Sequence, residues 1–144
     1  MKKEDTIKRD KNSRRKSSSV ALRIAYTSQG CRCYFSHDKL VELGFKEDGS
    51  KGLHGQYMTV TYVEHDNQKF LRVYPHTKGT DKFKLSGQAG KEIVYSNEIG
   101  RLVAEKIGID IENERRPSIR LCDGEIAQDE EKDACFEISL DNWK

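Results

Sequence analysis

Few residues in this sequence have the types and spacing that metal binding requires. The cysteines are the first candidates, because Cys31, Cys33, Cys122 and Cys135 could together supply the four thiolates of a zinc site. Zinc sites normally use a Cys-x2-Cys turn, however, and a single residue separates the first pair here. Alternate residues of a strand share one face, so these two sulfurs could still point the same way. We favour free thiols that are buried or half-buried, and we expect neither a metal nor another cofactor.

The four histidines do not form a catalytic set. They are scattered along the chain without a partner at metal-ligand spacing, at positions His37, His54, His65 and His76. Ser36-His37-Asp38 has the residue types of a hydrolase triad, but consecutive side chains point apart and triads assemble from distant segments. The acidic stretch 123–133 lacks the glycine and final glutamate of an EF-hand loop. No phosphate-binding glycine loop or HExxH motif occurs, so we expect a protein that is not an enzyme.

Positive charge is concentrated in the first part of the chain. The 144 residues include 26 Lys and Arg and 24 Asp and Glu, a net charge of +2. Residues 1–19 hold eight of the basic residues and three of the acidic ones, a net of +5, which leaves 18 basic and 21 acidic residues, a net of −3, for the remainder. This segment has almost no apolar side chains, so we expect a disordered basic arm. Its Arg14, Arg15 and Lys16 are candidates for contact with nucleic-acid phosphates.

The composition indicates a soluble protein with no membrane partner. Hydrophobic and charged residues each make up 35% of the chain, and no stretch approaches the roughly 18 to 20 apolar residues of a membrane-spanning helix. The first residues contain no apolar signal-peptide core. Four cysteines without such a signal favour a reducing compartment, and a cytoplasmic location is expected by elimination.

The elements that must position the basic residues are mostly strands. Apolar, aromatic and β-branched patterns predict strands in the first half at residues 20–26, 31–35, 57–63 and 69–74. The last two form the clearest hairpin, around a polar turn. Ser36 is suited to cap a short helix over 38–43, which Gly44 would end.

The second half repeats this order. Strands are predicted at residues 83–85, 92–95, 119–122 and 134–140. Residues 86–90 are predicted to form a glycine-rich turn, and Ser96 to cap a helix over 97–107 that Gly108 would end. We expect the strands at 119–122 and 134–140 to be the two arms of one hairpin, with the acidic stretch as its turn.

The two halves align on their caps. Gly30-x4-Phe35-Ser36 matches Gly90-x4-Tyr95-Ser96, and the second helix is longer by four residues, about one helical turn. We therefore predict two strand–helix–hairpin units. The predicted boundaries are an arm at 1–19, a first unit at 20–75, a polar linker at 76–82 and a second unit at 83–144.

The segment Gly30-Cys-Arg-Cys-Tyr-Phe-Ser-His-Asp-Lys-Leu-Val-Glu-Leu-Gly-Phe, followed by the hairpin over 57–74, resembles the AbrB/MazE/SpoVT-like DNA-binding domain. Residues 92–109 and 119–140 resemble a second, more divergent copy. In that family two copies exchange hairpins to form one barrel, and a tandem, MraZ-like chain could build it alone. The resemblance implies an α+β, mainly β fold with a small AbrB-like or double-psi-like barrel, as a monomeric pseudo-dimer or a homodimer.

The resemblance also implies a function and a set of binding residues. It points to Arg23 and Arg32 in the first copy and to Lys84 and Lys91 in the second, with Arg32 the strongest candidate because a guanidinium can bind guanine through two hydrogen bonds. We expect a transcriptional regulator or antitoxin-like protein whose partner is duplex DNA. The alternative is a protein-binding inhibitor or interaction module that uses its acidic loops and strand edges. A ligand-binding or enzymatic barrel is the third hypothesis.

Overall fold

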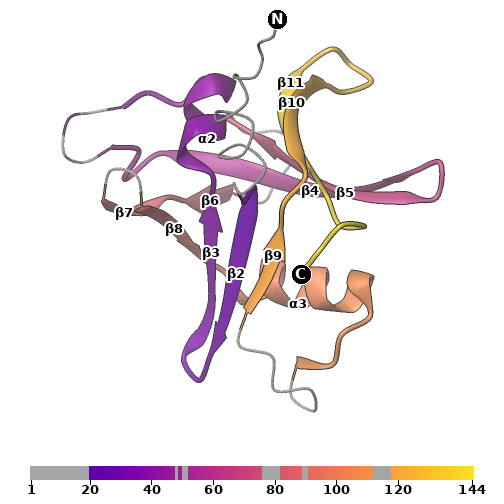
Figure 1. Cartoon of the computed structure of the whole chain (residues 1–144). Helices are drawn as coiled ribbons and strands as arrows, with labels where there is room; N and C mark the ends of the chain where they lie inside the picture. Colours follow the sequence, from indigo (N-terminus) through magenta and orange to yellow (C-terminus); the bar gives the residue numbers. More distant parts are fainter. Residues whose placement is uncertain (1–19, 48, 50–51, 76–81, 89–90, 112–117) are drawn as a thin grey trace, which may run out of the picture.

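The computed structural model describes residues 20–47, 49, 52–75, 82–88, 91–111 and 118–144 (Figure 1). This part of the chain is mainly β, as predicted. Its elements, in chain order, are β2 (Leu22–Thr27), β3 (Gly30–Phe35), α2 (His37–Leu43), β4 (Tyr57–His65), β5 (Gln68–Tyr74), β6 (Lys82–Lys84), β7 (Ser86–Gln88), β8 (Lys91–Tyr95), α3 (Asn97–Ile107), β9 (Ser118–Leu121), β10 (Gly124–Gln128) and β11 (Ala134–Ser139). The predicted arm, and the predicted linker apart from its last residue, lie outside the described residues.

The strands form two five-stranded antiparallel sheets. Sheet I has the order β7–β8–β3–β2–β9, and sheet II has the order β10–β11–β5–β4–β6. In each sheet a hairpin from the first half of the chain therefore lies between strands from the second half, which Figure 1 shows for β2 and β3 between β8 and β9. Each order is open at both ends, so the described pairings show two sheets, and the closed barrel stays a prediction.

A single apolar core joins both sheets and both helices. Strand periodicity defines its faces, because Leu22 and Ile24 of β2 are fully buried while Arg23 between them is not. Sheet II contributes Phe136 and Leu71 to the same core. Helix α3 packs on β3, and α2 packs on β10 and β11.

The helix ends are confirmed as predicted. The Ser36 and Ser96 hydroxyls each accept a hydrogen bond from the backbone N–H three residues later, at 3.4 and 3.1 Å. Gly44 and Gly108 end the two helices at φ values of 131° and 82°, which disfavour any residue with a Cβ. Neither of the described helices is both long and apolar enough to cross a lipid bilayer.

The predicted hairpin over 57–74 is also confirmed. Strands β4 and β5 pair along their length and close with His65 opposite Gln68. The two turn residues between them, Asp66 and Asn67, have φ values of 52° and 68°. Two consecutive positive φ values are typical of the tight turns that join antiparallel strands, and Asp and Asn tolerate them better than most residues do.

The predicted pairing of 119–122 with 134–140 is wrong. β9 pairs with β2 of sheet I, whereas β11 lies between β10 and β5 of sheet II. The cause is burial. Ile119 and Leu121 of β9 are fully buried opposite Ile24 and Leu22 of β2, so a strand distant in sequence provides the apolar partner.

Two predicted turns contain strands. The glycine-rich turn predicted at 86–90 begins with β7, and the acidic turn predicted at 123–133 contains β10. Only Leu85 separates β6 from β7, and only Cys122 and Asp123 separate β9 from β10. The chain thus passes directly from one sheet to the other at two corners.

Candidate nucleic-acid interface

Arginine and tyrosine side chains gather on the outer face of sheet I, opposite the core. In one cross-strand row, Arg120 of β9 lies opposite Arg23 of β2, which lies opposite Tyr34 of β3. In the neighbouring row, Arg32 of β3 lies opposite Tyr95 of β8. Residues directly opposite one another in a sheet share a face. We call these five residues the basic face.

Two arginines of the basic face are available for binding, and the third is held in place. Arg32 and Arg120 are exposed. Arg23 is half-buried, and its guanidinium carbon lies 4.3 Å from the centre of the Tyr34 ring, a cation–π contact. β2, β3 and β9 contain no acidic residue. The outer face of these strands is therefore positive although residues 20–144 together carry a net charge of −3.

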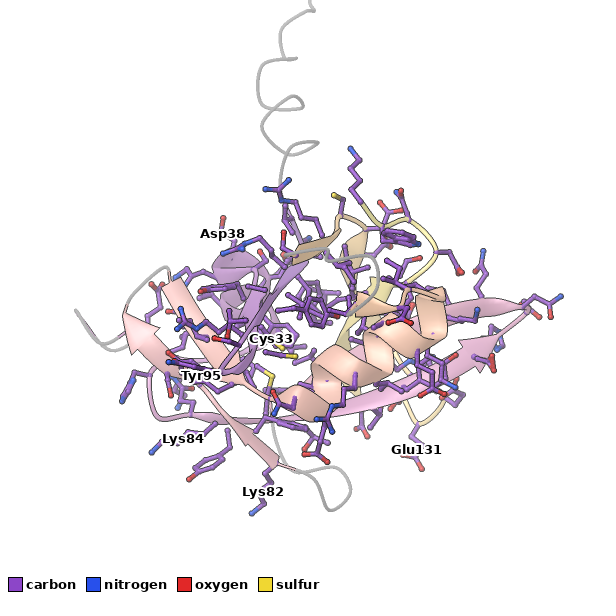
Figure 2. The ribbon with its side chains drawn as sticks, turned by 90° about the horizontal axis from the view of Figure 1, so that it is seen from below. Cys33, Asp38, Lys82, Lys84, Tyr95 and Glu131 are labelled. Carbon is purple, nitrogen blue, oxygen red and sulfur yellow. The ribbon has the colours of Figure 1, made fainter. Side chains whose placement is uncertain are left out.

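The predicted residue Lys84 lies beside this face. It belongs to β6 of sheet II, with Tyr57 as its cross-strand partner. Lys84 and Tyr95 line one surface hollow together, and Figure 2 shows them on the same side of the molecule as Lys82. Of the predicted residues, Arg32 and Lys84 therefore both lie beside Tyr95, and Arg23 lies on the same sheet face as Arg32.

The other predicted binding residues cannot be placed in the same way. Lys91 is the first residue of β8, but its side chain lies outside the described residues, and so do Arg14, Arg15 and Lys16. The sequence prediction missed Arg120. The alternation Ile119-Arg120-Leu121 was the available signal, because it turns the arginine away from a buried face.

No disulfide joins the four cysteines. Cys33 and Cys135 are buried, and Cys31 and Cys122 are half-buried. Burial, with the neighbouring Cys31 as a second cause, raises the pKa of the Cys33 thiol to about 12, so it is protonated and unreactive at neutral pH. The four sulfurs do not cluster into a metal-ligating group.

One group of three metal-ligating side chains occurs among the described residues, and it is acidic: Asp129, Glu131 and Asp133. Asp129 is buried, and its Oδ1 accepts hydrogen bonds from the backbone N–H groups of Glu131 and Asp133, both at 2.9 Å. Its Oδ2 accepts a hydrogen bond of 2.7 Å from the Tyr74 hydroxyl. These contacts are those of a side chain that fixes its own turn.

His37 joins the two halves of the chain through carboxylates. Its Nδ1 lies 3.0 Å from both carboxylate oxygens of Glu92, and its Nε2 lies 3.0 Å from Glu47. The Glu92 side chain is fully buried and also accepts a hydrogen bond of 3.3 Å from the Leu53 N–H. Burial opposes protonation of His37, but the hydrogen bonds to Glu92 and Glu47 outweigh it and raise its pKa. These partners are not those of a serine hydrolase triad, since Ser36 caps the helix instead.

We expect His37→Ala to destabilise the fold by about 2 kcal/mol at pH 6, because it removes hydrogen bonds to charged groups. A histidine whose folded pKa is raised stabilises fully below its unfolded pKa of about 6.5, and this contribution is lost as the pH rises through the folded value. Urea unfolding of both proteins at pH 6 and pH 9 should give a smaller difference at pH 9. His54→Ala, at an exposed histidine, is the control. Equal differences at the two pH values would contradict the role of the ion pair.

Neither a family model, nor a curated protein, nor a solved structure matches this chain in comparison.

Proposed function

We propose that this chain is a DNA-binding protein without catalytic activity, a transcriptional regulator or antitoxin-like protein of the AbrB-like kind. The basic face and the arm at 1–19 would bind the phosphates of duplex DNA. The observation that supports this most directly is the pair of cross-strand rows that gathers Arg23, Arg32 and Arg120 on one exposed sheet face. Arginine binds phosphate through a planar fork of donors, and phosphate contacts dominate affinity for DNA.

We further propose that the fold is a duplicated unit related by a two-fold axis. Gly30 begins β3 and Lys91 begins β8, each paired with the last residue of the preceding strand. The third residues after them, Cys33 and Val94, pair with one another, which is what a two-fold axis between the units requires. This correspondence also matches Arg23 with Lys84. In this correspondence Gly30 matches Lys91, one residue after the Gly90 that the sequence alignment gives.

The strand exchange supports the same proposal. β9 of the second half pairs with β2 of the first, and β4 of the first half pairs with β6 of the second. These are equivalent swaps. The segment 82–88 contains β6 of sheet II and β7 of sheet I, and the segment 118–128 contains β9 of sheet I and β10 of sheet II. These two segments therefore join the edge strands of one sheet to the edge strands of the other, so that the ten described strands follow one another around a ring. We propose that the two sheets are in this way one closed barrel.

The salt dependence of DNA binding tests the proposed function. We expect the full chain to bind labelled random duplex DNA, with an affinity that falls linearly with salt on logarithmic axes. Each phosphate contact contributes about −0.9 to the slope, so the two available arginines, Arg32 and Arg120, predict a slope of about −2, and the arm makes it steeper. Fluorescence anisotropy between roughly 50 and 200 mM salt measures this slope.

Two outcomes would overturn the proposal. One is the absence of measurable affinity for duplex DNA at the lowest salt concentration. The other is a full loss of affinity on replacing Arg14, Arg15 and Lys16 by alanine, with Arg32→Ala silent, because binding would then be nonspecific attraction by the arm. The expected result is a partial loss from each variant.

A further inference from the structure

Tyr95 is the most exposed large hydrophobic side chain among the described residues, and it stands between two hollows. Its exposed fraction is 62%. It lines a hollow of about 240 Å³ together with Arg32 and the tip of the β2–β3 hairpin. It also lines a hollow of about 490 Å³ together with Lys82 and Lys84. The ring is therefore a ridge with space and positive charge on both sides.

The neighbourhood of this ridge is suited to an anionic ligand. Arg32 is the direct cross-strand partner of Tyr95. On the other side of Tyr95, Lys84 lines the same hollow as the ring does. Asn97, the first residue of α3, lines both hollows, so the positive end of this helix lies there. Glu98 is the one carboxylate among the residues that line the two hollows.

The size of the sheet favours an unpaired strand over a groove of duplex DNA. Neighbouring strands lie about 4.8 Å apart, so five strands span roughly 19 Å, whereas the major groove is about 12 Å wide and admits two strands. Duplex DNA can therefore contact this face only through its phosphates. An unpaired base can stack on an exposed aromatic ring, whatever its identity.

We propose that Tyr95 is a stacking platform for an unpaired base of single-stranded nucleic acid, with Arg32 and Lys84 binding the phosphates on either side. This inference rests on the proposed function, because it names the form of nucleic acid that the basic face prefers. It differs in assigning the base contact to an aromatic ring rather than to an arginine.

The test measures affinity with labelled oligothymidylate, oligouridylate and random duplex DNA, using the full chain at low salt. Tyr95→Ala should weaken binding to the single strands by roughly 5- to 150-fold, the range for loss of one base–aromatic stack, and change duplex affinity less than two-fold. Tyr95→Phe should restore single-strand binding, because the ring and not the hydroxyl is needed. Comparing the two oligonucleotides distinguishes DNA from RNA as the source of the strand.

Tyr57→Ala is the matched control. Tyr57 is 53% exposed, yet it lines neither of the two hollows, so its removal should leave single-strand affinity unchanged. The stacking proposal is overturned if Tyr95→Ala leaves single-strand affinity unchanged, or if both variants reduce it equally. In either case, duplex binding by the full chain still supports the proposed function. No affinity of the full chain for any of the three nucleic acids overturns both.

Discussion

Replacing Arg32 and Arg120 together by alanine is expected to weaken duplex DNA binding by about 100-fold. Both side chains are exposed on the outer face of sheet I and belong to strands without acidic residues. A hydrogen bond to a charged group such as a phosphate is worth about 1.5–3 kcal/mol, and 1.4 kcal/mol is a factor of ten, so two contacts at the lower end of this range give the expected loss. Anisotropy titration at fixed salt measures it, and the salt slope should become shallower by about 2.

The matched control removes the same charge from other surfaces. Lys46 and Lys132 are exposed and lie outside sheet I, so replacing both by alanine changes the net charge equally and should reduce affinity only a few-fold. Neither double variant should unfold the protein, because exposed substitutions of this kind change stability by less than about 0.5 kcal/mol. Equal losses in the two variants would mean that net charge, and not the basic face, governs binding.

The features that depend on neighbouring residues can be predicted from this sequence. The N-caps Ser36 and Ser96 satisfy backbone donors three residues away, and Gly44 and Gly108 adopt the positive φ that ends each helix. The β4–β5 hairpin follows from two β-branched and aromatic runs around a polar turn. These signals act within a few residues, so a single sequence contains all the information that they need.

Pairings between distant strands could not be predicted in the same way. The choice of β2 as the partner of β9 depends on matching buried residues about 97 positions apart, Ile24 and Ile119 being 95 apart and Leu22 and Leu121 being 99 apart. Without that pairing, Arg120 has no visible relation to Arg23. The prediction therefore found two of the three arginines of the basic face.

The exposure of Tyr95 shows how a shift of one residue changes a predicted surface. Matching Gly30 with Gly90 makes Tyr95 the counterpart of Phe35, which is buried, with an exposed fraction of 4%. The strand pairing instead makes Tyr95 the counterpart of Tyr34, on the outer face, since neighbouring residues of a strand point to opposite sides. The sequence alignment matches the helix caps Ser36 and Ser96, which are 60 residues apart. The pairing of the strands before these helices matches residues that are 61 apart, such as Tyr34 and Tyr95.

The second large expected effect is the loss of stability when Phe136 is replaced by alanine. The Phe136 side chain is the largest of those that are fully buried in the core. On β11 it pairs with Val73 of β5 on one side and with Ile126 of β10 on the other. A Cβ on Gly124 would lie 2.7 Å from its ring, so the chain passes close to Phe136 as it turns the corner between β9 and β10. The ring thus packs where the two halves and the two sheets meet.

We expect Phe136→Ala to lower the free energy of unfolding by about 4 kcal/mol, because it combines the loss of a buried ring with a cavity that its neighbours cannot fill. For a domain of this size that is a fall in Tm of about 15 °C. Phe83→Ala, at a half-buried phenylalanine of β6, is the control and should cost less than half as much. Far-UV circular dichroism reports all the strands, while fluorescence of the single tryptophan reports sheet I, because Trp143 forms a β-bridge with Leu121.

If the exchanged strands make one cooperative unit, both signals should shift together in Phe136→Ala, although Phe136 belongs to sheet II and Trp143 borders sheet I. A tryptophan transition that stays at the wild-type temperature, while part of the circular dichroism signal is lost earlier, would mean that the sheets unfold separately. That result would argue against the closed barrel. A joint shift would support it, since the corners at 82–88 and 118–128 connect the sheets through continuous chain.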